Sequence, residues 1–450
     1  MRTISAADFG DFLWGAATSA YQIEGAHNAD GKELSVWDVF SHRRRKIKGG
    51  HNGDTACDHY HRWRQDVELL AELGLNSYRF SLSWPRLVRA DGSANEAGFA
   101  HYRRLLAALH EKNIRPLVTL YHWDLPQYIE ERGGWANRDI IRHFSDYTTL
   151  VIEKLGDLIN DFIVLNEPMI FLTLGYLLGL HAPGKRSIKK FFAASHHALL
   201  AQAEAARTIR AAIPGARIGT TVSTTAVYPA SERPRDLLAA ERFDVLYNTF
   251  YVDPVVGRGY PTRHFPFLRR IEKYVQPGDM EALRFDFDFW GINTYTRKVV
   301  RYSRITPVIH WRELKNPPGA AANCMNWEVY PEGLYDLLKK FSAYPEIREL
   351  MVTENGFAAE DQLVAGRVAD AERIGYYREY IGQVLRAKQE GVNVTGYFAW
   401  SLLDNFEWAE GYRPRFGLVH VDYLTQKRTI KDSGYWFRDF VRGKAPDKIT

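Results

Sequence analysis

Two glutamates stand where strand-forming runs end. The stretch DFIVLNEPM (161–169) carries an apolar run directly into Glu167, and ELMVTENG (349–356) leads in the same way into Glu354. Burying an ionised carboxylate is costly unless a nearby group requires it, so these positions call for an explanation. A pair of carboxyl groups can hydrolyse a glycosidic bond. One is protonated and assists the leaving oxygen, while the other is ionised and attacks or activates water.

A single glutamate at a strand end also has a structural interpretation, because it can form a salt bridge or cap a helix. Here each of the two acids stands beside an amide, since Asn166 precedes Glu167 and Asn355 follows Glu354. If the two acids are close together, the negative charge on one raises the pKa of the other, so that one keeps its proton. The paired arrangement therefore favours a catalytic interpretation over two separate structural carboxylates.

The elements that must position these acids alternate along the whole chain. Helical periodicity at 60–74, 101–113 and 140–156 separates runs with strand character. Near-continuous apolar strands between helices indicate parallel pairing with both faces covered, and eight such units predict a closed (β/α)8 TIM barrel. Its active site is expected at the C-terminal ends of the strands. The eight predicted strands are 12–22, 76–84, 114–123, 161–168, 216–223, 287–295, 349–356 and 394–404.

Composition and charge narrow the class of protein. The 450 residues are 46% hydrophobic and 25% charged, as in an ordinary globular protein, and no Pro-, Gly- or Ser-rich linker divides them. We therefore expect a single domain over 1–450. No apolar window is long enough to span a bilayer, and the N-terminal residues lack the apolar core of a secretory signal, so we expect a cytoplasmic protein that does not bind membranes.

Several local patterns resemble known sites but have simpler interpretations. The basic run HRRRKIK (42–48) is interpreted as a solvated loop, and no nucleic-acid partner is expected. GLHAPGKR (179–186) nearly matches a phosphate-binding loop, but Arg186 replaces the required hydroxyl and no strand leads into it. The spacing in CDHYH (57–61) is not that of metal ligands, and His196-His197 indicates a helix surface or packing.

Six segments in the order of the chain carry a resemblance to a known family. They are FLWGAATSAYQIEG, YRFSLSWPR, TLYHWDLPQ, NEP, VTENG and WSLLDNFEW. Together they resemble the family-one glycoside hydrolases, the β-glucosidase family, from Phe12 to about residue 440. The resemblance implies a retaining β-glycosidase without a metal or other cofactor. Its expected partner is a small-molecule β-glycoside.

The resemblance also implies roles for individual residues. Glu167 matches the acid/base of the family and Glu354 its nucleophile, while Arg79, Asn166 and Tyr295 match residues that support them. In double displacement, Glu354 attacks the anomeric carbon while Glu167 protonates the departing oxygen and later deprotonates water. The residues that match the family's substrate-binding set are Gln22, His122, Trp123, Asn166, Trp327, Trp400, Glu407 and Trp408.

The substrate implied by the resemblance is a terminal β-D-glucosyl residue of a β-glucoside or a short cello-oligosaccharide. Glu407 would repel a phosphate dianion, so an unphosphorylated sugar is expected. Three alternatives stay open: a β-galactosidase or β-fucosidase, a transglycosylating enzyme, and a sugar-binding barrel without activity. The chain departs from the family pattern at Phe162 and Val164, which suggests altered packing behind the acid/base. It also departs at Thr294, which removes one ring near the site.

Overall fold

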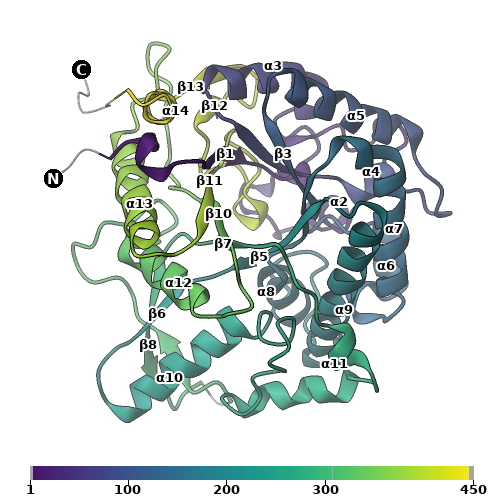
Figure 1. Cartoon of the computed structure of the whole chain (residues 1–450), viewed down its shortest axis with the longest axis vertical. Coiled ribbons are helices and arrows are strands. Elements are labelled where there is room, and N and C mark those ends of the chain that lie inside the picture. The colour runs from purple at the N-terminus through teal and green to yellow at the C-terminus, as the bar shows by residue number, and fades with distance from the viewer. Residues whose placement is uncertain (1–3, 307, 445–450) are drawn as a thin grey trace.

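The computed structural model describes residues 4–306 and 308–444, and the two ends of the expected domain 1–450 lie outside these ranges. Eight parallel strands close into a barrel, in which the first strand pairs with both the second and the last. The predicted (β/α)8 barrel is thus confirmed, and each predicted strand contains one barrel strand (Figure 1). The strands are β1 (Leu13–Ala17), β2 (Ser77–Ser81), β3 (Arg115–Tyr121), β4 (Asp161–Asn166), β5 (Arg217–Ser223), β7 (Phe289–Asn293), β10 (Leu350–Asn355) and β11 (Val394–Trp400).

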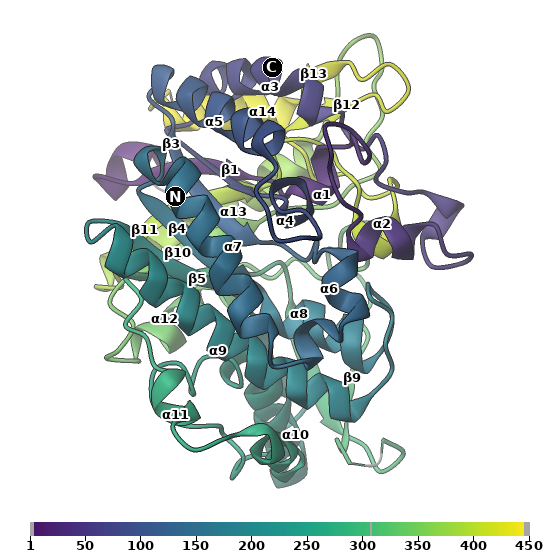
Figure 2. The same cartoon turned by 90° about the vertical axis from the view of Figure 1, so that its right-hand side faces the viewer.

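Helices surround the barrel and cover the outer faces of its strands (Figures 1 and 2). The three predicted helices are present, although the second begins five residues earlier, at Glu96. The long helices are α3 (His59–Glu72), α5 (Glu96–Glu111), α7 (Ile140–Leu155), α9 (Ile188–Ala212), α10 (Pro234–Asp244), α12 (Glu332–Ser342), α13 (Ala371–Gln389) and α14 (Asp432–Val441). The short helices are α1 (Ala20–Ile23), α2 (Val36–Ser41), α4 (Trp84–Leu87), α6 (Gln127–Glu131), α8 (Pro168–Leu172) and α11 (Asp279–Ala282). No helix among the described residues is long and apolar enough to cross a membrane.

The alternation of side chains along β4 shows how the core is divided. Phe162 and Val164 pack in the layer between the barrel and its helices, whereas Ile163 packs inside the barrel with Phe289 and Met351. Successive strand residues face opposite sides of a sheet, so this division follows from the strand geometry. The two departures from the family pattern in β4 therefore lie on the helix side of the strand.

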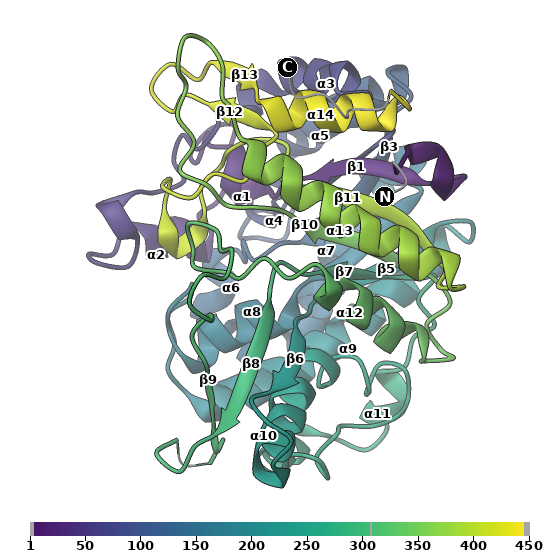
Figure 3. The same cartoon turned by 90° about the vertical axis from the view of Figure 1, so that its left-hand side faces the viewer.

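Two small sheets outside the barrel are absent from the sequence prediction. One contains β6 (Ala226–Pro229), β8 (Arg297–Tyr302) and β9 (Trp311–Glu313), and the other contains β12 (Val419–Val421) and β13 (Arg428–Ile430). Strands β6 and β8 follow closely after barrel strands β5 and β7, and they extend away from the barrel beside α10 (Figure 3). The sheet β6-β8-β9 thus adds a wall at the site-forming end of the barrel.

The paired histidines at 196 and 197 lie in α9, and both are buried. His196 contacts the Tyr260 hydroxyl through Nδ1, at 2.8 Å, and a carboxylate oxygen of Asp279 through Nε2, also at 2.8 Å. Of the two sequence interpretations, packing is therefore correct and helix surface is wrong.

Candidate active site

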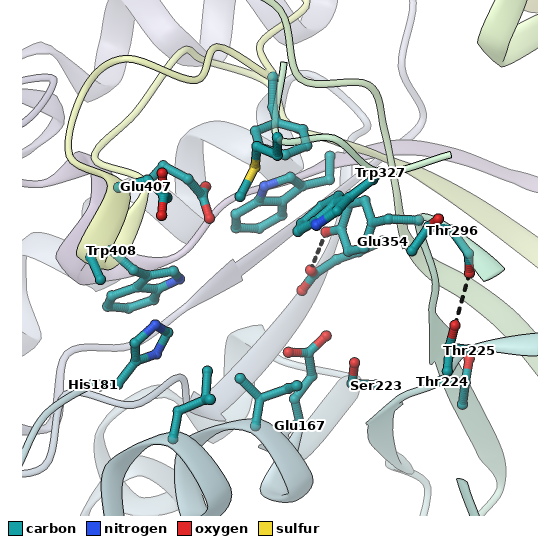
Figure 4. Close-up of a pocket in the computed structure, with 18 of the residues that line it drawn as sticks. Glu167, His181, Ser223, Thr224, Thr225, Thr296, Trp327, Glu354, Glu407 and Trp408 are labelled. Carbon is teal, nitrogen blue, oxygen red and sulfur yellow. Dashed lines mark hydrogen bonds between the residues drawn. The ribbon is translucent and has the colours of Figure 1, made fainter. Parts of the chain in front are cut away.

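A cavity of about 320 Å³ opens at the C-terminal ends of the barrel strands. Glu167, which follows β4, and Glu354, in β10, point toward one another across this cavity (Figure 4). Nine of the residues predicted from the sequence line this cavity: His122, Trp123, Glu167, Tyr295, Trp327, Glu354, Trp400, Glu407 and Trp408. Gln22, Arg79 and Asn166 are fully buried behind the cavity wall.

Glu167 stands at the turn between β4 and α8. Its backbone has a positive φ of 51°, and Pro168 begins the helix that follows, where proline's missing N–H is not needed. The Asn293 side chain donates a hydrogen bond of 2.8 Å from Nδ2 to Glu167 Oε1. Burial raises the pKa of the Glu167 carboxyl to about 8, and the negative charge of Glu354 adds to the rise. Glu167 is therefore positioned to hold a proton at neutral pH.

Glu354, at the end of β10, is held by two donors on its two oxygens. Arg79 Nη1 donates to Oε1 at 2.5 Å, and the Tyr295 hydroxyl donates to Oε2 at 2.7 Å. Burial raises the pKa of the Glu354 carboxyl as well, but the positive charge of Arg79 and these two hydrogen bonds oppose the rise. Within the pair, Glu354 is thus the group whose ionised form is stabilised.

Hydrogen bonds behind the cavity connect Glu354 to His122 through the side chains of Arg79 and Asn166. Arg79 Nη2 donates to Asn166 Oδ1 at 2.5 Å, and Asn166 Nδ2 lies 3.0 Å from His122 Nε2. Burial and the charge of Arg79 hold the pKa of His122 well below its usual range. The imidazole is therefore neutral, and its Nε2 accepts the Asn166 hydrogen bond. Each polar side chain in this series of hydrogen bonds is oriented by the next.

Glu407 forms the opposite side of the cavity from the two central acids (Figure 4). Burial, together with the charge of Glu354, raises the pKa of the Glu407 carboxyl to about 8. Gln22 lies behind Glu407 and is itself held in place, because its Nε2 donates 2.9 Å to the backbone oxygen of Phe406. The Gln22–Glu407 contact is longer, at 3.4 Å. A sugar with several hydroxyl groups would meet both acceptors and donors on this side.

Aromatic rings supply the apolar surfaces of the cavity. The rings of Trp123 and Trp408 lie 4.6 Å apart, and His122 stacks 6.0 Å from Trp400. Trp327 stands on the other rim, with its ring 5.3 Å from that of Tyr295. A sugar ring has apolar C–H faces and polar hydroxyl groups at its edge, so it suits a cavity in which flat apolar rings stand beside polar groups.

The sequence prediction missed several residues that line the cavity or hold Glu167. Asn293 stands close to the C-terminal end of the predicted strand 287–295, and thus at the site-forming end of the barrel, although no role was predicted for it. Ser223 also ends a strand, whereas Tyr247 and His181 lie in segments without strand character. The Tyr247 hydroxyl lies 3.3 Å from Ser223 Oγ, so this pair adds hydroxyl groups beside Glu167. Over residues 4–306 and 308–444, no group of His, Cys, Asp or Glu side chains is arranged to hold a metal ion.

A parallel barrel with two facing carboxyl groups in a polar and aromatic cavity is the arrangement of a glycoside hydrolase. The sequence profile of glycosyl hydrolase family 1 matches residues 7–446, and the chain belongs to this family. The predicted resemblance is thus confirmed.

Individual relatives agree with the family assignment. The chain is 43% identical to a 1,4-β-D-glucan glucohydrolase of Thermotoga neapolitana, over 96% of this chain and 97% of that protein. It is 39% identical to a bifunctional β-D-glucosidase/β-D-fucosidase of Bifidobacterium breve, over 96% and 97% of the two chains. The crystallised family 1 β-glucosidase of Thermotoga maritima superposes with a TM-score of 0.95 at 41% identity, over 100% of both chains. The protein is a family 1 glycoside hydrolase of the β-glucosidase type.

Proposed function

We propose that the protein is a retaining β-glucosidase that releases terminal unphosphorylated β-D-glucosyl residues from β-glucosides or short cello-oligosaccharides. The observation that carries the proposal is the unequal environment of two facing carboxyl groups. Glu354 has a cation and a phenol as donors, whereas Glu167 has one neutral amide. This division matches the bare nucleophile and the protonated acid that double displacement requires.

The first step forms a glycosyl-enzyme. A Glu354 oxygen attacks the anomeric carbon, the glycosidic bond breaks, and the Glu167 proton moves to the departing oxygen. In the second step Glu167, now ionised, takes a proton from water as the water oxygen attacks the same carbon. The bond to Glu354 then breaks, and both acids return to their starting states. Two inversions at one carbon give net retention.

The supporting residues have proposed roles in the same scheme. Arg79 and Tyr295 keep Glu354 ionised and aimed, and Asn166 is proposed to bind the sugar 2-hydroxyl. Its side chain is already held by Arg79 and His122, so the amide is oriented before substrate arrives. A preoriented donor can strengthen its contact as charge develops on the sugar, without reorganisation at that moment.

The remaining predicted residues are proposed to bind the sugar and its leaving group. Glu407 would form hydrogen bonds with sugar hydroxyls, and a carboxyl group at this position offers a phosphate dianion no counter-charge, which favours an unphosphorylated substrate. Trp327, half-buried on the far rim, would form the platform for the leaving group. The other proposed contacts are Gln22, His122, Trp123, Trp400 and Trp408.

A second candidate activity is β-fucosidase, because a relative at 39% identity is named as bifunctional for glucosides and fucosides. Glu407 could accept a hydrogen bond from either epimer at the 4-position, which extends this alternative to β-galactosides. Rates on a panel of aryl β-glucosides, β-galactosides and β-fucosides, with short cello-oligosaccharides alongside, would rank these activities. A glucoside rate below the other two would overturn the proposed preference.

The covalent step has a direct test. A 2-fluoro-glucoside with a good leaving group should trap the enzyme, and peptide mass mapping should place the label on the peptide that holds Glu354. A label on any other peptide would overturn the nucleophile assignment. Turnover of a chromogenic β-glucoside, with Glu354→Ala as the comparison, separates an enzyme from an inactive sugar-binding barrel.

We also propose a cytoplasmic setting and a single domain. Both cysteines, Cys57 and Cys324, are free, as is usual in a reducing compartment. Cell fractionation followed by activity measurement tests the location, and a single cooperative unfolding transition is expected of one domain.

A further inference from the structure

Two basic segments that are far apart in the sequence meet at one edge of the cavity. Arg43 Nη1 donates to the backbone oxygen of Pro183 at 3.4 Å, and Gly184 lies against the Phe40 ring. This contact places the run 43–48 beside the run 185–190. We call their nine cationic side chains the basic rim: Arg43, Arg44, Arg45, Lys46, Lys48, Lys185, Arg186, Lys189 and Lys190.

Most of the basic rim has no acidic partner. Lys48 pairs with Glu410 at 2.7 Å, and Lys185 pairs with Glu130 at 3.3 Å. The other seven cations form no ion pair with any described residue, and six of the seven are exposed. Nine positive charges exceed the formal net charge of +5 of the entire chain. The rest of the chain therefore carries a formal net charge of −4, whereas these two segments contain no acidic residue of their own.

The start of α9 strengthens the positive potential of the basic rim at some expense of helix stability. Lys189 and Lys190 lie in its first turn, which contains no acidic residue. The N-terminus of a helix carries a partial positive charge, so acidic residues there are stabilising and lysines are unfavourable. Stability alone does not explain this choice of residues, whereas a requirement for positive potential does.

The basic rim adjoins the cavity through two lining residues. Lys48 holds Glu410, which lines the cavity, and His181, which also lines it, is close in sequence to the segment 185–190. The loop after α2, which carries the first basic segment, projects from the body of the molecule on this side (Figure 2). None of the nine cations lines the cavity itself, but the rim adjoins it through Glu410 and His181, so a charged group at the cavity mouth lies in the electrostatic field of the rim.

We propose that the basic rim selects β-glucosides whose leaving group carries a negative charge, such as a carboxylate or a sulfate. The inference rests on the proposed β-glucosidase function and names a substrate class for it. Unpaired cations beside a cleft raise the local concentration of anions, by about 10- to 1,000-fold in favourable cases. The neutral glucosyl group would still bind among the acids of the cavity, while the charged leaving group on Trp327 would face the basic rim across the cavity mouth.

The test compares two chromogenic substrates whose leaving groups differ by one carboxylate group. They are 4-nitrophenyl β-D-glucoside and 3-carboxy-4-nitrophenyl β-D-glucoside. The test variant is Arg44→Glu/Arg186→Glu/Lys189→Glu, three exposed side chains without ion partners. Its Lys189→Glu change places an acid in the first turn of α9, which favours folding.

A matched control changes the net charge equally at a distance from the cavity. Arg104, Arg269 and Arg378 are exposed on the outer surface and do not line the cavity, so Arg104→Glu/Arg269→Glu/Arg378→Glu serves this purpose. For each protein, the measured quantity is kcat/KM on the anionic substrate divided by kcat/KM on the neutral one. We expect this ratio to fall about tenfold in the test variant at about 10 mM ionic strength and to stay unchanged in the control.

Salt gives an independent measurement in the wild-type protein. At about 0.5 M salt the Debye length is only a few ångström, so the wild-type ratio should approach that of the test variant. An equal ratio in the test and control variants would overturn the proposal, as would an equal loss on both substrates. DNA binding is measured for the same proteins. If the two variants give equal ratios, and if the wild-type and control proteins bind DNA whereas the test variant does not, the proposal is overturned in favour of a nucleic-acid-binding surface. If wild-type protein does not turn over the neutral glucoside, the proposed function fails first.

Discussion

The surroundings of Glu167 and of Glu354 differ although the two side chains are chemically identical. Each ends a barrel strand, each is buried, and each faces the same cavity. Glu354 is paired with Arg79 and bonded by Tyr295, whereas Glu167 accepts a bond from the neutral side chain of Asn293. The comparison shows that the partners around a carboxyl group, rather than its burial, determine which of two acids keeps the proton.

Removal of the Glu354 carboxyl, which is paired with Arg79, should have the largest effect on the rate of turnover. Glu354→Ala should lower kcat for an aryl β-glucoside by at least about 10,000-fold, because the proposed covalent intermediate cannot form. Steady-state rates provide the measurement, and a correct thermal transition confirms folding. Azide added to this variant should restore turnover with an α-glucosyl azide as product, since the small anion attacks in place of the carboxylate.

Removal of the Glu167 carboxyl should reduce activity less than removal of the Glu354 carboxyl, and azide should give the opposite anomer of glucosyl azide. Glu167→Ala should lower kcat/KM by about 100- to 10,000-fold, as expected of general acid catalysis. The loss should be smallest for substrates whose leaving group needs little protonation. Here azide should yield a β-glucosyl azide, because it attacks the glycosyl-enzyme. The same azide anomer from both alanine variants would contradict the division of roles.

The pH profile tests the proton assignment. In the proposed mechanism Glu167 holds a proton in the first step, and the pKa of this carboxyl is raised to about 8. As pH rises through this value the proton is lost, so kcat/KM should fall on the alkaline side with a midpoint near pH 8. Glu167→Gln should have little activity and no such alkaline limb, measured on a substrate with a very good leaving group. An unchanged limb in that variant would assign it to another group.

A smaller effect is expected from removing one of the two hydrogen-bond donors to Glu354. Tyr295→Phe removes one donor to Glu354 and leaves Arg79 in place. Because the lost hydrogen bond favours the ionised carboxylate, the pKa of Glu354 should rise. We expect kcat to fall about 10-fold and the acidic limb of the pH profile to move to higher pH. A loss of rate with an unmoved acidic limb would show that the phenol acts only through packing.

The smallest expected effect concerns stability. The folded-state pKa of Glu167, about 8, lies above the ordinary glutamate value of 4.5, so between these pH values the folded protein binds more protons than the unfolded chain. Its stability therefore falls as pH rises through this window. Glu167→Gln removes this penalty and should raise the free energy of unfolding by on the order of 1–2 kcal/mol at pH 7. Denaturant titrations at pH 5 and pH 8 should show a larger gain at pH 8.

Much of the barrel and its cavity was predictable because the signals are local. The period of apolar residues distinguishes strands from helices, and the number of such units predicts the closed barrel. Polar residues at the strand ends then indicate the site. The sheet β6-β8-β9 escaped this reasoning, because its strands are short and their pairing joins segments about 70 residues apart. Tyr247 and His181 escaped it because neither follows a barrel strand.

The sequence by itself determined the number and order of the strands and the placement of Glu167 and Glu354 at their ends, since these depend on neighbouring residues. Only the tertiary structure decided that Arg79 pairs with Glu354, 275 residues away, and that Asn293 holds Glu167. It also decided that the segments 43–48 and 185–190 meet. The reason is physical: barrel closure brings distant strand ends together, and the charge next to an acid sets its protonation state.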